Sequence, residues 1–344
     1  MCKSRRSLLE IGVVASEQDL PVIREFFELF QAHWEICRAA ITLSLISAYH
    51  ENTMRYVLIT TAWNEERNIE RTIESVIAQS VRPLRWIIVN DGSTDGTEQI
   101  VGNYASRYSW IHLIIVPEHN GHNFGAKVRC FKTGLNEVRY DNYEIIGNLD
   151  ADLTFESDYF EYLIDKFSAD PHLGVGGTPF VEANTKIYNY RFTNIEHVSG
   201  ACQLFRRECF EDVGGYIPIA SGGIDWVAVT TARMMGWKTR TFTDRTIVHH
   251  RAIGTRSGKL SGYRFRLGMK DYNLGNGAIW ELFRALYQMR YRPVVLGGLA
   301  MLAGYLWALS RHRPRPISNE LIQFCRREQK NRLRAKLISF MKRD

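Results

Sequence analysis

The stretch MRYVLITTAWNEE, residues 54–66, decides the fold, because an apolar run of strand length meets a polar turn and then a helical pattern. Residues 56–61 are all apolar or β-branched, which predicts a buried strand. A helix is expected over 64–79, with Ile69, Ile73 and Val76 on one apolar stripe. The polar residues between them are therefore expected at the carboxyl end of a strand.

The same alternation of strand and helix continues to residue 149. Strands are expected over 85–90, 111–116 and 143–149, and helices over 98–108 and 123–137. Such alternation predicts a parallel sheet with helices on its faces. We therefore expect an α/β fold with a mostly parallel, Rossmann-like sheet, and such sheets bind ligands at the carboxyl ends of their strands.

Two acidic motifs follow predicted strands and so fall at that edge. DAD at 150–152 ends the fourth strand, and a hard divalent cation is held by one or two carboxylates together with phosphate oxygens and water. VNDGSTDG at 89–96 places Asp91 after the second strand, where a carboxylate can accept hydrogen bonds from a base or a ribose. Each motif alone is also compatible with a simple turn, and Asp152 with a helix cap.

Three further segments carry chemistry. Lys127 opens a helix where a phosphate could meet the helix N-terminus, and a solvated helix face is the alternative. Asp225 follows two glycines in GGIDWVA, where it could be a general base beside an acceptor platform formed by Trp226, or a helix N-cap. His249 and His250 end a strand, where one ring could complete a metal site, touch phosphates or simply lie at the surface.

In this order the motifs resemble the family 2 glycosyltransferases, which have the GT-A fold. The resemblance covers residues 54–250 and rests on TTAWNEERNIERTIESVIAQS at 60–80, IIVNDGSTDGT at 87–97, NLDADL at 148–153 and GGIDWVAVTTARMMGW at 222–237. The region after 250, with amphipathic helices, looks like bacterial members used in polysaccharide assembly.

The resemblance implies inverting transfer from a nucleotide-diphospho-sugar, a UDP- or GDP-sugar, with Mg²⁺ or Mn²⁺ as cofactor. Asp225 would be the catalytic base, although Ile224 stands where the family often has Glu. Asp152 would be the principal metal ligand, with Asp150 and His250 as the other metal residues, and Trp226 would contact the acceptor. The nucleotide-sugar would be bound by Thr61, Ala62, Trp63, Asn64, Glu65, Asp91, Lys127, Asp150 and Ala151.

The expected acceptor is a glycan or a lipid-linked sugar in polysaccharide or glycolipid assembly. A polyprenyl-phosphate sugar synthase has the same motifs and a lipid phosphate acceptor, and it is the alternative. A sugar nucleotidyltransferase usually has a Gly-rich loop after the first strand, whereas TTAWNEE has no glycine. Intact Asp150, Asp152 and Asp225 argue against a non-catalytic adaptor. The sequence has no Gln-x-x-Arg-Trp motif, which argues against a processive synthase.

The formal charge of +7, from 44 Lys+Arg and 37 Asp+Glu, belongs to one tail. Residues 311–344 hold 11 basic and 3 acidic residues, and the rest of the chain holds 33 and 34. Nucleic acid is not an expected partner, because the body has no basic stripe and the tail no interleaved aromatics.

Residues 293–310 are 18 uncharged residues next to this tail. They are just short of the roughly 20 residues of a membrane span. They predict a peripheral or re-entrant helical segment on an anionic membrane, at the cytoplasmic face. A hairpin buried against the domain is the alternative.

Three regions are expected: a helical extension over 1–53, a glycosyltransferase domain over 54–255, and amphipathic or hydrophobic helices with a basic tail over 256–344. The first 53 residues are either an extension that packs on the domain or a membrane, or the result of an upstream start codon, with Met54 as the functional start. The six cysteines have neither Cys-x-x-Cys nor zinc spacing, which indicates reduced thiols and a cytosolic environment.

Overall fold

A computed structural model of the chain describes Trp34, Arg38 and residues 54–117, 124–182, 194–251, 260–291 and 293–341. The chain divides into two compact units, Met1–Thr53 and Met54–Asp344. Apart from Trp34 and Arg38, the predicted helical extension over 1–53 lies outside the described residues. The fold described below is that of the second unit.

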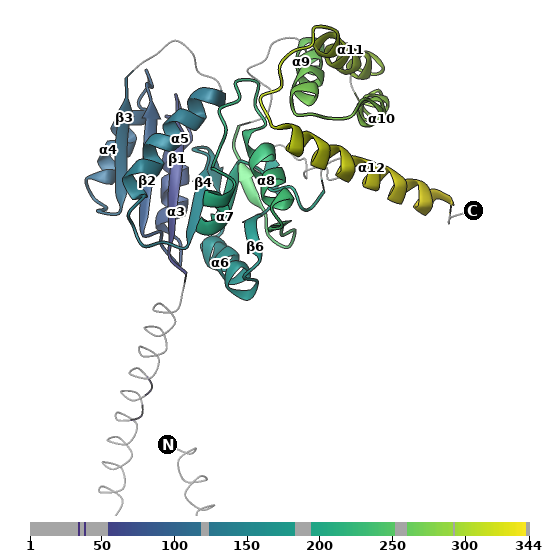
Figure 1. Ribbon diagram of the computed structural model, residues 1–344. Helices are drawn as coiled ribbons and strands as arrows, with labels where there is room; N and C mark the ends of the chain where they lie inside the picture. Colours follow the sequence, from purple (N-terminus) through teal and green to yellow (C-terminus); the bar gives the residue numbers. More distant parts are fainter. Residues whose placement is uncertain are drawn as a thin grey trace, which may run out of the picture. The chain divides into compact units, whose positions relative to one another are not determined.

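Seven strands form the main sheet, in the order β3-β2-β1-β4-β8-β6-β9 (Figure 1). The first four of these are parallel, β8 is antiparallel to β4 and β6, and β9 is parallel to β6. A smaller sheet has the order β5-β10-β7. The predicted mostly parallel α/β sheet is confirmed. The strands are β1 (Tyr56–Ala62), β2 (Arg85–Asp91), β3 (Ile111–Val116), β4 (Ile145–Leu149), β5 (Leu153–Thr154), β6 (Leu173–Gly177), β7 (Phe180–Glu182), β8 (Cys202–Arg206), β9 (Lys238–Thr241) and β10 (Ile247–His249).

Helices cover both faces of the main sheet, because the side chains of its central strands alternate between two cores. Val57 and Ile59 of β1 pack in one core with residues of α5 (Phe124–Val138), α7 (Arg207–Asp212) and α8 (Ile224–Met234). Tyr56 and Leu58 pack in the other core with α3 (Ile69–Ile77), α4 (Thr97–Ala105) and α6 (Tyr159–Ala169). Burial on both faces is typical of parallel strands and explains the unbroken apolar runs in the sequence.

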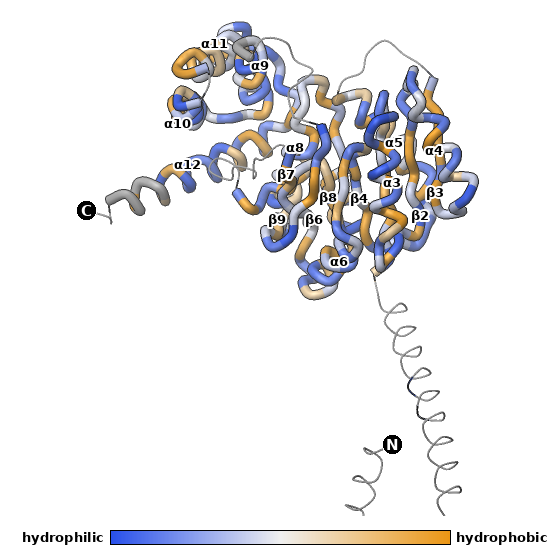
Figure 2. The backbone as a smooth tube through the Cα atoms, turned by 180° about the vertical axis from the view of Figure 1, so that it is seen from behind, coloured by the Kyte–Doolittle hydropathy of each residue, from blue (hydrophilic) through white to orange (hydrophobic). Residues whose placement is uncertain are grey.

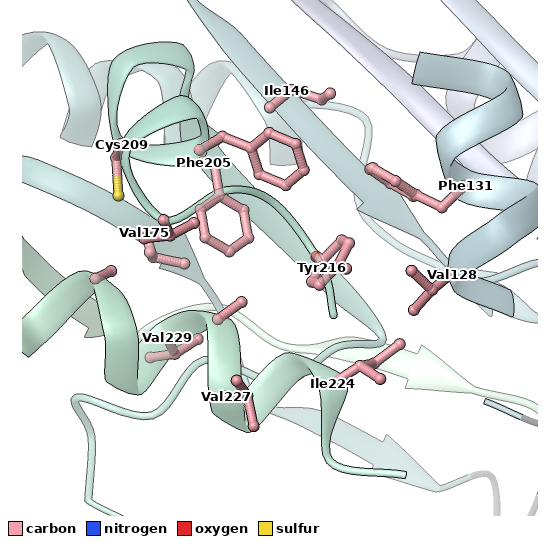
Figure 3. Packing of buried hydrophobic residues seen from close by; sticks show 14 of the residues in the cluster. Val128, Phe131, Ile146, Val175, Phe205, Cys209, Tyr216, Ile224, Val227 and Val229 are labelled. Carbon is pink, nitrogen blue, oxygen red and sulfur yellow. The ribbon is translucent and has the colours of Figure 1, made fainter. Parts of the chain in front are cut away.

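The core between the sheet and α8 fixes the helix that carries Asp225. Figure 3 shows Ile224, Val227 and Val229 of α8 in the same cluster as Phe205 and Tyr216. The Tyr216 ring also contacts Phe131 of α5 edge to face, with 4.9 Å between ring centroids, and its buried hydroxyl donates a hydrogen bond to Gln203 Oε1 over 2.7 Å. Dense packing of this kind holds a helix in one position.

Four helices follow the smaller sheet: α9 (Leu260–Asn273), α10 (Ala278–Gln288), α11 (Leu296–Ser310) and α12 (Asn319–Met341). Helices α9 and α11 cross at two glycines. A Cβ on Gly268 would lie 1.8 Å from the Met301 carbonyl oxygen, and one on Gly304 would lie 2.0 Å from the Phe265 carbonyl oxygen. Over the described residues, no helix combines the length and the apolar character needed to cross a membrane.

The first helix is shorter than predicted. The pattern indicated a helix from residue 64, but α3 begins at Ile69. Asn64 has a φ of 53°, which is outside the helical region. Residues 64–68 instead form a turn that is hydrogen-bonded to the loop after β2. This turn follows β1, at the edge of the sheet where the parallel strands have their carboxyl ends.

Candidate active site

The polar turns after β1 and β2 are joined by hydrogen bonds. The backbone amide of Asn64 donates to Ser93 Oγ over 3.0 Å, and the amide of Thr94 donates to Asn64 Oδ1 over 2.9 Å. The amide of Glu65 donates to Thr97 Oγ1 over 2.8 Å. The turn therefore holds one predicted segment against the DGSTDG loop, at the carboxyl ends of β1 and β2. That segment is Thr61, Ala62, Trp63, Asn64 and Glu65.

Asp91 is the last residue of β2 and is 6% exposed. The Cys130 thiol of α5 donates a hydrogen bond to Asp91 Oδ1 over 2.9 Å. Burial, and then the hydrogen bond to Asp91, raise the pKa of Cys130 to about 12, so the thiol keeps its proton and remains a donor. Helix α5 thus orients the carboxylate that was predicted to meet a base or ribose.

Lys127 and Asp150 form an ion pair at the same edge. Lys127 lies in the first turn of α5 and Asp150 directly follows β4. Burial acts to lower the pKa of Lys127, but Asp150, Asp225 and Asp152 act to raise it, and the net shift is upward. The structure therefore keeps a charged ammonium group among the three predicted acidic residues. Ala151, between the two aspartates, is buried.

The DAD motif and His249 form a cluster that fits a divalent cation. One donor atom from each of Asp150, Asp152 and His249 lies within 4.8 Å of the others, and His249 Nε2 is 3.5 Å from Asp152 Oδ1. His249 Nδ1 is paired with the Arg251 carbonyl oxygen, which places the Nδ1 proton there and turns the Nε2 lone pair to the aspartates. Burial and Asp150 raise the pKa of Asp152, an unfavourable arrangement that a cation would relieve.

His250, the histidine predicted to join the metal residues, lies elsewhere. Its Nε2 atom is 2.9 Å from Thr154 Oγ1, and its backbone amide donates to the Asp152 carbonyl oxygen over 2.9 Å. Strand β10 pairs antiparallel with β5, and successive side chains of a strand point to opposite faces. The register therefore brings His249 to the aspartates instead.

Arg251 was not predicted as a site residue, although it directly follows the two histidines in the sequence HHR at 249–251. It forms an ion pair with Glu65, and its Nε atom lies 3.9 Å from Asp152 Oδ2. It thus connects the turn after β1 with the DAD motif, two segments that are far apart in the sequence. An arginine directly after the histidines was the available signal.

Two glycines present Asp225. Gly222 and Gly223 have φ values of 85° and 92°, and a Cβ on Gly223 would also lie 2.8 Å from Leu274 Cδ1. Gly223 is the N-cap of α8, so Asp225 is inside the first turn and is not the cap. The backbone amide of Gly200 donates to Asp225 Oδ2 over 3.2 Å.

The charges around Asp225 keep it ionised. Burial acts to raise its pKa, whereas His197 and Lys270 act to lower it, and the net shift is downward. Burial lowers the pKa of His197 itself to about 4, so this ring is neutral near pH 7. Lys270 is therefore one cation that remains near the Asp225 carboxylate, and Lys127, whose pKa Asp225 helps to raise, is another.

A polar cavity of about 260 Å³ opens beside Asp225, and Trp226 lies on its wall. Two ion pairs lie in its wall: Arg233 with Glu328 at 2.9 Å, and Arg284 with Asp271 at 2.6 Å. Its lining comes from α8, α9, α10, α12 and the segment before β8, which the sequence did not connect. The lining residues are Asn194, His197, Asp225, Trp226, Arg233, Leu267, Lys270, Asp271, Leu274, Asn276, Trp280, Arg284, Cys325, Glu328, Gln329 and Arg332.

Known proteins share this sequence pattern. Residues 57–191 match a family model described as glycosyl transferase family 2. Poly-beta-1,6-N-acetyl-D-glucosamine synthase of Staphylococcus epidermidis is 24% identical over 192 residues, covering 50% of this chain and 44% of that protein. The synthase of the same name from Staphylococcus aureus strain COL is 27% identical over 172 residues, covering 44% of this chain and 39% of that protein. The match thus spans less than half the length of these relatives.

A solved structure shows the same kind of fold. GalNAc-T7 with UDP, GalNAc and Mn²⁺ has a TM-score of 0.52 and 15% sequence identity, and the match covers 81% of this chain and 55% of that chain. At this identity the likeness concerns the fold, and it agrees with the predicted GT-A type. The motifs and the family match thus agree that residues 57–191 are similar to glycosyl transferase family 2.

Proposed function

We propose that the chain transfers a sugar from a UDP- or GDP-linked donor to an acceptor hydroxyl in polysaccharide or glycolipid assembly, with inversion at the anomeric carbon. One observation carries the proposal. Lys127 lies close to two features at the edge where the parallel strands end. One is the cluster of Asp150, Asp152 and His249 that could hold a cation, and the other is the ionised Asp225. Ligands of such sheets bind at this edge.

The donor side is the cluster and the two joined turns. Asp150, Asp152 and His249 would hold Mg²⁺ or Mn²⁺, whose Lewis acidity neutralises charge on a leaving diphosphate. Lys127 adds a fixed positive charge beside Asp150. The turn at 61–65 and Asp91 would bind the ribose and the base. The relatives named above are polysaccharide synthases, which supports an acceptor of that class.

The acceptor side is the cavity beside Asp225. The carboxylate would take the proton of the acceptor hydroxyl while the oxygen bonds to the anomeric carbon and the bond from that carbon to the diphosphate breaks. Positioned proton transfer of this kind contributes about 10²- to 10⁴-fold to rate. Trp226 and Trp280 on the cavity wall offer apolar surfaces for a sugar ring, and the charged and amide side chains offer hydrogen bonds to its hydroxyls.

The test separates donor binding from transfer. A thermal-shift screen of UDP- and GDP-sugars, with and without Mn²⁺, identifies the donor, because a ligand that binds the folded state raises the unfolding temperature. Asp225→Asn is then compared with Asp165→Asn, an exposed aspartate on α6.

We expect Asp225→Asn to bind donor as the wild type does and to transfer sugar about 10²- to 10⁴-fold more slowly. The control should behave as the wild type. Near-normal transfer by Asp225→Asn would remove this residue from the role of base, and a screen without any stabilising nucleotide-sugar would contradict the proposed function as a whole.

A further inference from the structure

The helical hairpin of α10 and α11, residues 278–310, exposes an unusual amount of apolar surface. Of the twenty large apolar side chains that are exposed in the described parts of the chain, twelve belong to this hairpin. Figure 2 shows the apolar turns of these helices in orange. Contiguous exposed apolar surface on a folded protein marks an interaction site.

Helix α10 has two opposite faces. Trp280 and Arg284 line the polar cavity, while Leu282, Phe283 and Leu286 are 45%, 47% and 50% exposed. Ile279 precedes these three at helical spacing and is 68% exposed. The exposed residues thus form one stripe, at i, i+3, i+4 and i+7, that faces away from the cavity.

The turn between the helices and helix α11 continue this apolar surface. Val294 in the turn and Leu296, the first residue of α11, are 59% and 63% exposed. On α11, Leu299, Leu306 and Trp307 are 48%, 49% and 37% exposed. Their spacing of seven and eight residues places them along one side of the helix, and the glycines of α11 occupy the side that packs on α9 and α10.

Positive charge surrounds the apolar surface. Residues 285–313 contain four arginines and no acidic residue. The guanidinium groups of Arg311 and Arg313 lie 5.9 and 4.8 Å from the centre of the Trp307 ring, and both arginines are exposed. Aromatic residues flanked by arginine are typical of the region where a membrane meets water.

We propose that this hairpin docks on the surface of an anionic lipid bilayer. Helix α11 has 15 residues and is therefore about 22 Å long, less than the roughly 30 Å of the hydrocarbon core. The hairpin lies in the headgroup region, with its apolar stripe toward the acyl chains. A second copy of the chain fits the same surface less well, because a symmetric contact would bring like-charged arginines together.

Docking would also orient the cavity, because α10 carries the exposed stripe on one face and lines the cavity with the opposite face. This consequence rests on the proposed function: an acceptor in the cavity would be held close to the lipid headgroups. The docking itself does not depend on catalysis and is tested without it.

The test is cosedimentation of the full chain with vesicles of phosphatidylcholine, with and without phosphatidylglycerol. Phe283→Asp combined with Leu299→Asp places two charges on the stripe. The matched control is Leu84→Asp, an exposed leucine outside the hairpin that is 42% exposed. We expect the double variant to lose at least about tenfold in vesicle partitioning, and the control to partition as the wild type. Since the substituted side chains are exposed, all three proteins should unfold at similar temperatures.

A second pair of changes tests the charge. Arg311→Gln with Arg313→Gln should weaken binding to phosphatidylglycerol vesicles about fivefold for each arginine removed. Equal binding by the wild type and all variants would place the lipid contact elsewhere, and no binding by the wild type would refute docking. If the wild type is a dimer and the double Asp variant is a monomer, the surface binds a second copy of the chain. That result would overturn the proposal. Donor-induced thermal shifts on the same samples show separately whether the proposed function stands.

Discussion

Substituting Glu281 by Gln should change how the stability of the protein depends on pH. Glu281 is completely buried on α10, and neither of its carboxylate oxygens has a hydrogen-bond partner among the described residues. The same holds for Asp271 Oδ2, while Asp271 Oδ1 pairs with Arg284. A proton on Glu281 would allow its carboxyl group to donate a hydrogen bond to Asp271, which would give both groups a partner. Burial, and then the charge of Asp271, raise the pKa of Glu281 to about 9.

The sign and size follow from this pKa. A glutamate in the unfolded chain titrates near pH 4.3. Between that value and about 9, the folded protein binds one proton more than the unfolded chain, so stability falls as pH rises. The slope is about 1.4 kcal/mol per pH unit. Between about pH 6 and about pH 8, the free energy of unfolding of the wild type should fall by roughly 2 to 3 kcal/mol more than that of Glu281→Gln.

Urea unfolding of both proteins at the two pH values measures this difference. The variant retains every other titrating group, so the difference between the two slopes isolates Glu281. Glu208→Gln, at an exposed position, should keep the slope of the wild type. Parallel stability curves for the wild type and Glu281→Gln would refute a protonated Glu281 in the folded protein.

Three further predictions concern packing, thiols and the donor side. Gly304→Ala should lower the free energy of unfolding by about 1 to 3 kcal/mol, because its Cβ would lie 2.0 Å from a carbonyl oxygen of α9. Gly102→Ala, on α4 with 3.9 Å to its nearest neighbour, should raise it by up to about 1 kcal/mol, and urea unfolding compares the two. At most two of the six thiols should react rapidly with a thiol reagent in the folded protein, because burial raises the pKa of four of them to about 12; rapid reaction of more than two would contradict this. Lys127→Met should weaken donor binding about tenfold or more by calorimetry, since it removes the cation paired with Asp150, and unchanged affinity would exclude that contact.

The central sheet could be predicted because its strands are buried on both faces. Unbroken apolar runs and the polar turns after them mark β1 to β4 in the sequence. The start of α3 could not be predicted, because the turn that delays it depends on Ser93 and Thr97, about thirty residues away. Helical periodicity does not contain such long-range hydrogen bonds.

The aspartates of the site could be predicted from their places after strands or after paired glycines. The choice of His249 over His250 could not, because it depends on the register between β10 and β5. The cavity could not be predicted from the sequence either. Amphipathic helices show which side is apolar, but not that Trp280 and Lys270 on two separate helices meet beside Asp225.

Calorimetric titration of the donor, with and without Mn²⁺, tests the central claim most directly. The wild type should bind the nucleotide-sugar tightly only with Mn²⁺, and Asp152→Asn should lose at least about tenfold in that affinity. The His249→Asn variant should weaken it as well, whereas His250→Asn should not. Equal donor affinity without Mn²⁺, or unchanged affinity in Asp152→Asn, would contradict a cation-bridged donor at this cluster.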